Sequence, residues 1–106
     1  MPYIIATNTF PSHKQNDVIK KYIELIPKYP ADESLSEVVA QPVAFTNKGF
    51  KVVSIWEVKE GKFEEAFTQI NTYYYEFKDI EGYETVIKVW LTFPEATSIA
   101  GIPSPE

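Results

Sequence analysis

Cysteine and arginine are both missing from this chain of 106 residues. Without cysteine the chain has no disulfide, no thiolate metal ligand and no cysteine nucleophile. Without arginine its ten basic residues are all lysines, and the formal net charge at pH 7 is −5. Nucleic-acid recognition favours clustered positive charge and the arginine fork, so we expect no nucleic-acid partner.

Histidine and long apolar runs are also scarce. His13 is the only histidine, and one histidine does not make a metal site, so no metal is expected. No window approaches the roughly 18 apolar residues of a membrane span, and residues 1–6 lack a basic region before their apolar residues. These features predict a cytoplasmic protein that does not associate with membranes.

Apolar and aromatic residues are plentiful, at 44% and 15% of the chain. This composition predicts a folded core, and the length fits one domain. We place that α+β domain at residues 1–93. Residues 94–106 form a C-terminal tail with a short helical stretch between Pro94 and Gly101 and a loose end at residues 103–105.

Strand-like and helix-like patterns alternate along the domain. Runs of β-branched and aromatic residues predict strands over residues 3–10, 38–45, 51–58 and 83–93. Apolar residues at helical spacing predict helices over residues 13–26 and 62–78. The expected apolar face of the first helix consists of Val18, Ile19, Tyr22, Ile23 and Ile26, and that of the second of Phe63, Ala66, Phe67, Ile70, Tyr74 and Phe77. Ser12 and Gln15 have the spacing of a capping box at the start of the first helix.

Pro42 constrains how these strands are arranged. It lies in the middle of the second predicted strand and cannot donate a ladder hydrogen bond, so that strand must be an edge strand or a bulged one. Right-handed crossovers then give a ferredoxin-like β-α-β-β-α-β sandwich with a four-stranded antiparallel sheet. The first and third strands are central, which leaves Pro42 on an edge.

Two helices can cover only one face of such a sheet. In the last strand Ile87, Val89 and Leu91 form an aliphatic row that suits the helix side, and Lys88 and Trp90 then face outward. The other residues that we expect on the open face are Tyr3, Ile5, Thr7, Thr9, Ser54 and Trp56. A large apolar patch of this kind predicts a homodimer that is joined through the open sheet face.

This order of elements and this hydrophobic pattern resemble the dimeric α+β barrel superfamily, which includes small members similar to antibiotic-biosynthesis monooxygenases. Some haem-degrading members carry an asparagine on the first strand, a tryptophan on the third and an iron-ligating histidine on the second helix. Asn8 and Trp56 look similar to the first two. The second helix has Tyr73, Tyr74 and Tyr75 but no histidine, so the resemblance implies no haem, and we expect no cofactor.

Six residues are candidates for a ligand-binding site, and no catalytic residue stands out. They are Asn8, His13, Trp56, Tyr74, Lys88 and Trp90. Each also has a structural interpretation. An asparagine at a strand end can bond the next turn, His13 can be a surface residue in the first turn of a helix, and the aromatic residues can simply pack.

Two functions remain open on these residues. The first is a non-catalytic homodimeric domain that binds a small apolar ligand or a protein partner. The second is a cofactor-independent oxygenase or isomerase that acts on a small cyclic compound. The first is preferred, because no residue set converges with catalytic spacing.

Overall fold

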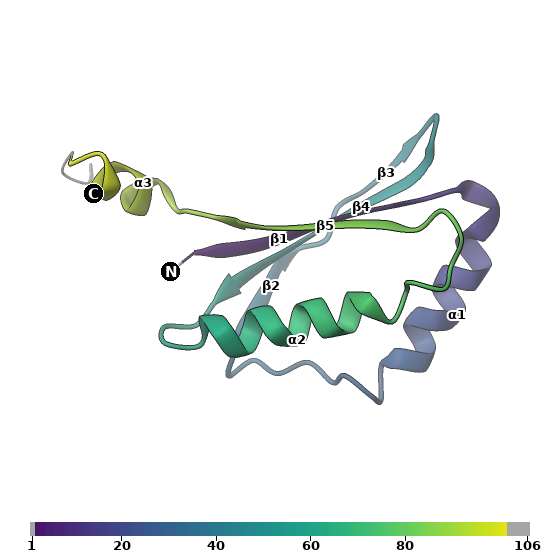
Figure 1. Cartoon of the computed structure of the whole chain (residues 1–106), viewed down its shortest axis with the longest axis horizontal. Coiled ribbons are helices and arrows are strands. Elements are labelled where there is room, and N and C mark those ends of the chain that lie inside the picture. Colours follow the sequence, from purple (N-terminus) through teal and green to yellow (C-terminus); the bar gives the residue numbers. More distant parts are fainter. Residues whose placement is uncertain (1, 102–106) are drawn as a thin grey trace.

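The computed structural model describes residues 2–101 as an α+β domain with one antiparallel sheet (Figure 1). Its strands are β1 (Tyr3–Phe10), β2 (Ser36–Ala40), β3 (Val43–Thr46), β4 (Gly49–Val58) and β5 (Glu84–Trp90). Its helices are the 3₁₀ turn η1 (Ser12–Lys14), α1 (Gln15–Leu25), α2 (Phe63–Tyr75) and α3 (Phe93–Ile99). Within the described range, none of these helices has the length and apolar character of a membrane span.

The sheet has the order β2-β4-β1-β5, with β3 also paired to β4. The first and third predicted strands, β1 and β4, are therefore interior, as expected. The sheet of one chain is open, because β5 lies at one edge and β2 and β3 lie at the other. Its five strands replace the four that we expected from the sequence.

Pro42 accounts for the extra strand. The single strand expected over residues 38–45 is interrupted there, so that β2 ends at Ala40 and β3 begins at Val43. A register shift between Val38 and Ala40 adds a further irregularity to the pairing with β4. The Pro42 carbonyl still accepts a hydrogen bond from the backbone N–H of Val53 at 3.0 Å. The edge position predicted from Pro42 is confirmed.

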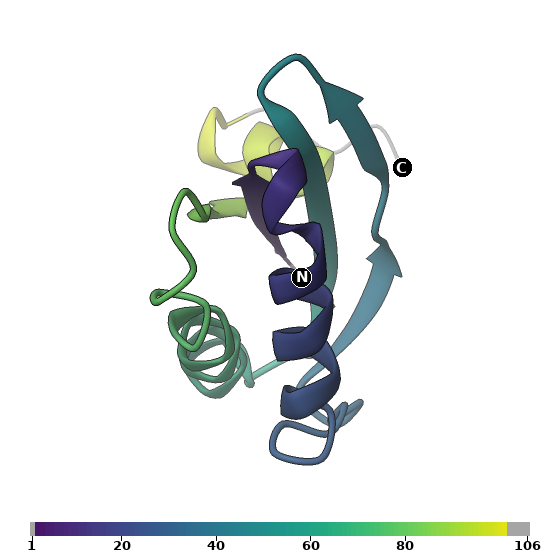
Figure 2. The ribbon, with the colours of Figure 1, turned by 90° about the vertical axis from the view of Figure 1, so that its right-hand side faces the viewer.

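Helices α1 and α2 lie on the same side of the sheet (Figure 2). The core between the two layers includes the β1 residues Ile4 and Ala6, both fully buried, and the α2 residues Ala66, Ile70 and Tyr74. These α2 residues recur at intervals of four, so they form one stripe along the helix. The predicted apolar face of the second helix is confirmed.

The first helix differs from its prediction in two ways. Neither η1 nor α1 has a side-chain cap, so the capping box expected from Ser12 and Gln15 does not form. Leu25 is the buried residue of α1, whereas Ile23 remains 60% exposed and Ile26 lies 52% exposed just after the helix. The helix is rotated so that Val18 and Leu25, one heptad apart, face the core.

The two sheet faces follow from the strand register. Ile4 is paired with Trp56 and with Val89, so these three side chains share the helix side. Tyr3 is paired with Glu57 and with Trp90, which therefore share the open face. The predicted facing of Ile87, Val89, Lys88 and Trp90 is confirmed.

The predicted facing of the third strand is wrong. Ser54 is paired with Ala6 and is 1% exposed, and the Trp56 ring packs on Tyr74 of α2, so both lie on the helix side. The open-face residues of β4 are instead Lys51, Val53, Ile55 and Glu57.

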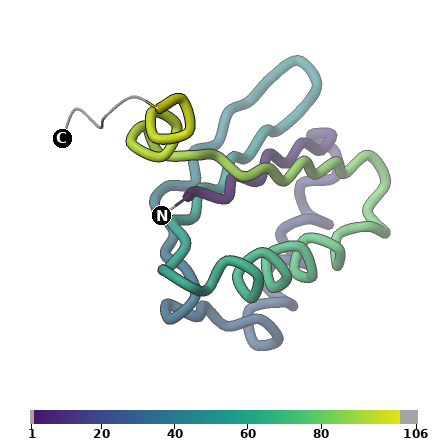
Figure 3. The backbone as a smooth tube through the Cα atoms, turned by 60° about the vertical axis from the view of Figure 1, so that its left-hand side comes forward, coloured from purple at the N-terminus to yellow at the C-terminus, as the bar shows by residue number. Residues whose placement is uncertain are grey.

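The tail contains the short helix that its proline and glycine indicated. Thr92 caps α3, since its Oγ1 accepts a hydrogen bond from Glu95 N at 3.3 Å and its N–H donates to Glu95 Oε1 at 2.8 Å. The helix lies beyond the end of the sheet, apart from α1 and α2 (Figures 1 and 3). The loose end expected at residues 103–105 falls outside the described residues.

Gly49, the first residue of β4, gives a test of the close approach between the β3–β4 hairpin and the end of β1. Its φ is +113°, and a Cβ there would collide with the Phe10 carbonyl oxygen and approach the Pro11 Cα at 3.0 Å. Gly61 has a φ of +74° with open space around it. We expect Gly49→Ala to lower the free energy of unfolding by at least about 3 kcal/mol in urea titrations, and Gly61→Ala by about 1 kcal/mol. Equal losses would contradict this close approach.

Candidate functional site

Two polar side chains are buried in the middle of the sheet, beneath α2. Asn8 of β1 is 2% exposed and Ser54 of β4 is 1% exposed. Asn8 Oδ1 accepts a hydrogen bond from Thr85 Oγ1 at 2.9 Å, and Ser54 Oγ accepts one from Gln41 Nε2 at 3.3 Å. Within residues 2–101 no buried side-chain nitrogen or oxygen lacks a partner. Asn8, Ser54, Gln41 and Thr85, together with Tyr74, are called the polar cluster below.

Tyr74 brings α2 into the polar cluster. Its hydroxyl hydrogen-bonds with Ser54 and Asn8, while its ring meets Trp56 edge-on at a centroid distance of 6.0 Å. Burial raises the pKa of the Tyr74 phenol, and the hydrogen bonds to Ser54 and Asn8 oppose part of this rise. The hydroxyl is therefore protonated at neutral pH.

A shallow cavity of about 350 Å³ opens between the second half of α2 and β5. Its lining residues are Asn71, Tyr74, Tyr75 and Lys78 on one side and Tyr83, Thr85 and Ile87 on the other. Tyr74 and Thr85 belong to the polar cluster, so the cluster reaches the floor of this cavity. The Lys78 ammonium lies 4.4 Å from the centre of the Tyr75 ring.

Tyr83 lines the cavity and is held by two aromatic neighbours. Its ring stacks on Phe10 and on Phe77, with the Phe77 centroid at 4.8 Å. Burial raises the pKa of the Tyr83 phenol well above its usual value, despite a hydrogen bond with Thr85. The cavity therefore presents protonated hydroxyl groups and aromatic faces to whatever enters it.

A wider hollow of about 580 Å³ lies on α2 over Glu64, Glu65, Thr68 and Gln69. These residues belong to one helix alone, and no residue of another element lines the hollow. It therefore offers no convergent groups, and the smaller cavity at the polar cluster is the candidate site.

A second polar contact holds the two helices together next to the site. Glu76, just after α2, accepts hydrogen bonds from Lys28 Nζ at 2.6 Å and from the Tyr29 hydroxyl at 2.8 Å. The hydrogen bond from Lys28, followed by that from Tyr29, lowers the pKa of the Glu76 carboxyl. This contact, the Glu76 latch, fixes the chain after α1 against the end of α2.

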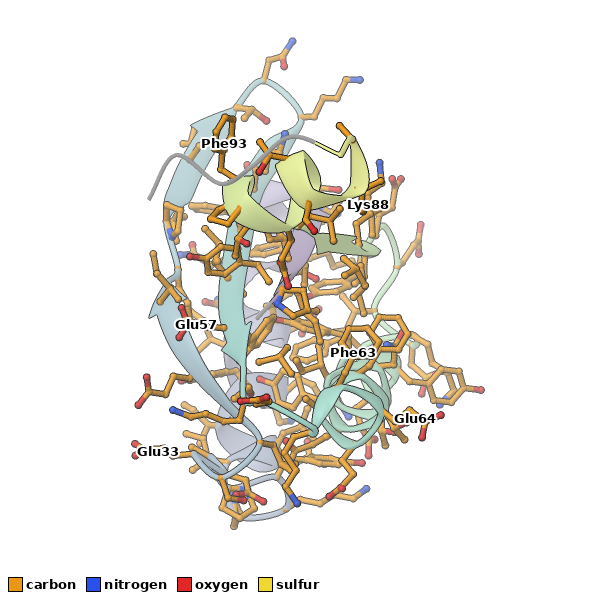
Figure 4. All side chains as sticks on the ribbon, turned by 90° about the vertical axis from the view of Figure 1, so that its left-hand side faces the viewer. Glu33, Glu57, Phe63, Glu64, Lys88 and Phe93 are labelled. Carbon is orange, nitrogen blue, oxygen red and sulfur yellow. The ribbon has the colours of Figure 1, made fainter. Side chains whose placement is uncertain are left out.

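The structure brings together three of the six candidate residues and separates the other three. Asn8, Trp56 and Tyr74 meet beneath α2. His13 is exposed in η1, away from the cavity lining. Lys88 and Trp90 lie exposed on the open face, and Figure 4 shows Lys88 above the end of β5 with α2 below. These three are not part of the candidate site.

Tyr74 is the one lining residue of the cavity that was among the candidates, and sequence reasoning missed the other six. They are Asn71, Tyr75, Lys78, Tyr83, Thr85 and Ile87. Thr85 could have been found from the parity of the last strand, because it shares a face with Ile87 and is paired with Asn8. Lys78 and Tyr83 were expected in the second helix and the last strand, but α2 ends at Tyr75 and β5 begins at Glu84, so both lie in the connection between these elements.

Comparison with known proteins gives a fold and no family. No family model matches the chain, and no curated protein matches it. A solved structure titled "De novo designed protein Foldit4" is similar in fold, with 16% identity and a TM-score of 0.52 over 86% of this chain and 96% of that one. At this identity the similarity supports the α+β architecture alone.

Tyr74→Phe tests whether the polar cluster contributes to stability. Removing the hydroxyl leaves Ser54 and Asn8 with one partner fewer in a buried position, so we expect a loss of about 1–2 kcal/mol in the free energy of unfolding. Tyr75→Phe, next to it on α2 and 66% exposed, is the matched control and should change stability by less than about 0.5 kcal/mol. Equal effects in chemical denaturation would contradict the cluster.

Proposed function

We propose that this chain is a homodimeric domain that binds a small, largely apolar molecule in the cavity between α2 and β5. The observation that carries this proposal is the junction of cavity and polar cluster, where the hydroxyl groups of Tyr74 and Thr85 meet a lining that also contains aromatic rings, Ile87 and the polar side chains of Asn71 and Lys78. Ligand sites commonly combine apolar walls with a few fixed polar groups, and their volumes begin near about 300 Å³. The cavity has this size, and its lining combines apolar and polar groups in similar measure.

The cavity also indicates the shape and polarity of the ligand. Tyr75 and Tyr83 line it with aromatic faces, which favour a flat molecule. The Lys78 ammonium is a hydrogen-bond donor, so a carbonyl or other acceptor oxygen suits the polar side of the ligand. The Thr85 hydroxyl already donates to Asn8 Oδ1, so its oxygen can only accept a hydrogen bond from a ligand. We infer a small planar compound with at least one acceptor oxygen.

Binding is favoured over catalysis because the cavity lacks a general base. Tyr74 and Tyr83 have raised pKa values and stay protonated, and His13 lies elsewhere. The alternative is a cofactor-independent oxygenase or isomerase for a small cyclic compound, as in the dimeric α+β barrel superfamily that the sequence resembles. Product formation from a bound compound would favour that alternative.

The open sheet face supports the homodimer. Its apolar residues include Tyr3, Ile5, Val53, Ile55 and Trp90, and Trp90 is 53% exposed in the single chain. A second copy placed on this face would cover the surface that α1 and α2 leave bare, and it would complete a ferredoxin-like dimeric α+β barrel.

The ligand proposal predicts saturable binding that depends on Thr85. We expect a thermal-shift screen of small phenols, aromatic ketones and aromatic carboxylates to find compounds that stabilise the protein by mass action. For such a compound, Thr85→Val should weaken binding about tenfold in calorimetry, through loss of one hydroxyl contact. Thr68→Val, on the outer side of α2, is the control and should bind normally. Equal affinities in the two variants would exclude this cavity as the site.

The dimer proposal predicts twice the chain mass of 12.2 kDa in light scattering at micromolar concentration. Trp90→Ala should weaken association by about 2 kcal/mol or more, because it removes an aromatic side chain from the interface. Val89→Ala, its neighbour on the helix side, should lower fold stability and leave association unchanged. A monomer at that concentration would refute the homodimer.

A further inference from the structure

The lining of the α2–β5 cavity differs in charge from the rest of the chain. Lys78 lines it, and among the described residues no aspartate or glutamate does. The other lining residues are three tyrosines, an asparagine, a threonine and an isoleucine. The whole chain, in contrast, has 15 acidic residues against ten lysines and a formal net charge of −5. The cavity therefore offers a positive charge on an acidic protein.

Lys78 has no carboxylate partner within residues 2–101. The lysines that do form an ion pair there are Lys14, Lys21, Lys28, Lys59 and Lys62. Asp79 and Glu81 follow Lys78 in the connection to β5, but neither pairs with it and neither lines the cavity. The positive charge of Lys78 is therefore free to interact with a group that enters the cavity.

The end of α2 leaves the Lys78 ammonium at the cavity. A lysine just after a helix can interact with the last carbonyl groups of that helix. Here the carbonyls of residues 73–75 already accept backbone N–H groups, at 3.0 to 3.2 Å. The ammonium lies instead 4.4 Å from the centre of the Tyr75 ring, which is part of the lining. Figure 1 shows the connection that carries Lys78 rising from the end of α2 to β5.

An ionised oxygen suits this position better than a neutral carbonyl. Both accept a hydrogen bond from an ammonium group, but a bond to an ionised acceptor is shorter and about twice as strong. Tyr75 and Tyr83 supply aromatic faces for a flat ring in the same cavity. A carboxylate attached to an aromatic ring meets both conditions.

The β5 side of the cavity sets a second condition. Because Thr85 Oγ1 donates its hydrogen to Asn8 Oδ1 at 2.9 Å, a ligand must bring the donor to this hydroxyl. Lys78 follows α2 and Thr85 lies in β5, so the two groups line the cavity from different elements. A hydroxyl group on the aromatic ring, separate from the carboxylate, supplies that donor.

Building on the proposed ligand-binding function, we propose that the ligand is a small hydroxylated aromatic carboxylate, with its carboxylate on Lys78 and its hydroxyl donating to Thr85. Lys78 then selects an acid over the corresponding neutral amide. Thr85 selects a hydroxylated ring over a bare one. The aromatic lining contributes affinity for the ring itself and makes neither distinction.

Matched acids and amides test the charge selection. The probes are para-hydroxybenzoate and para-hydroxycinnamate, each with its amide, which has nearly the same shape and no charge. In calorimetry at low salt we expect an acid to bind saturably and about fivefold more tightly than its amide, because a pair with an exposed lysine contributes modestly. In about 1 M salt, where screening acts over about 3 Å, the preference should fall to less than about twofold.

Variants of Lys78 assign the preference to this residue. Lys78→Gln should bring the affinity for the acid to within about twofold of that for the amide and leave the amide affinity unchanged, whereas Lys78→Arg should keep the preference. Lys48→Gln is the control, because Lys48 is exposed in the β3–β4 turn, has no ion pair among the described residues, and gives the same change in net charge. It should bind both probes as the wild type does.

Benzoate and cinnamate, which lack the hydroxyl group, test the contact with Thr85. We expect each to bind about fivefold more weakly than its hydroxylated form to the wild type, and Thr85→Val to remove this difference. The affinity for benzoate itself should change less than about twofold in Thr85→Val. An equal loss for both ligands would show that Thr85 acts on the shape of the cavity alone and would refute the hydroxyl contact.

The outcomes separate this ligand class from the proposed function. If acid and amide bind equally to the wild type, or if Lys78→Gln keeps the preference, the carboxylate assignment is wrong while the cavity remains a binding site. If neutral phenols or ketones bind with dependence on Thr85 and no acid binds, the result is the same. If no planar compound binds, both proposals fail.

Discussion

The structure depends on the burial of one face of β1 beneath α2. Ile4 and Ala6 are fully removed from solvent, and both backbone edges of β1 are used, one by β4 and one by β5. A strand that is hydrogen-bonded on both sides and packed on one face has few ways to shift, since a slip of one residue would turn its buried side chains to the opposite face. The positions of the neighbouring strands follow from it.

The same strand makes the interior partly polar. Asn8 continues the row of Ile4 and Ala6, so burying that row also buries an amide. The cost is offset by hydroxyl groups from β5 and α2, which meet the amide where these elements come closest. Because Tyr74 and Thr85 also line the α2–β5 cavity, the groups that satisfy Asn8 are the groups that would orient a ligand.

How far the sequence predicts this arrangement depends on the element. The edge position of Pro42 and the facing of Ile87 and Val89 could be predicted because each rests on one local rule, the missing N–H or the alternation of a short strand. The facing of Ser54 and Trp56 could not be predicted, because it depends on the register that is set with β1. The Ser12 cap failed because the chain enters α1 through a 3₁₀ turn after Pro11, where Ser12 already lies inside the turn.

The candidate site, too, could be predicted from the sequence only in part. Asn8 and Trp56 could be grouped by their resemblance to a known arrangement of residues, and Tyr74 was a candidate from the second helix. Tyr83 and Lys78, in contrast, lie in the connection between α2 and β5, whose course is decided by tertiary packing. His13 was attractive for its chemistry alone, and its place in η1 gives it no neighbour in the cavity. Residue type predicts what a side chain can do, but the register of strands decides which side chains meet.

The unequal edges of the sheet have a consequence for how the protein resists aggregation. The edge formed by β2 and β3 is broken by Pro42 and by the register shift at Val38 and Ala40, so it cannot offer a continuous ladder of backbone groups to a foreign strand. The β5 edge has neither interruption, and its outer groups form an unbroken row over seven residues. Amyloid-like extension, in which strands add one after another to a free edge, would therefore have to start at β5, where Glu84 and Lys88 supply the charged side chains that discourage it.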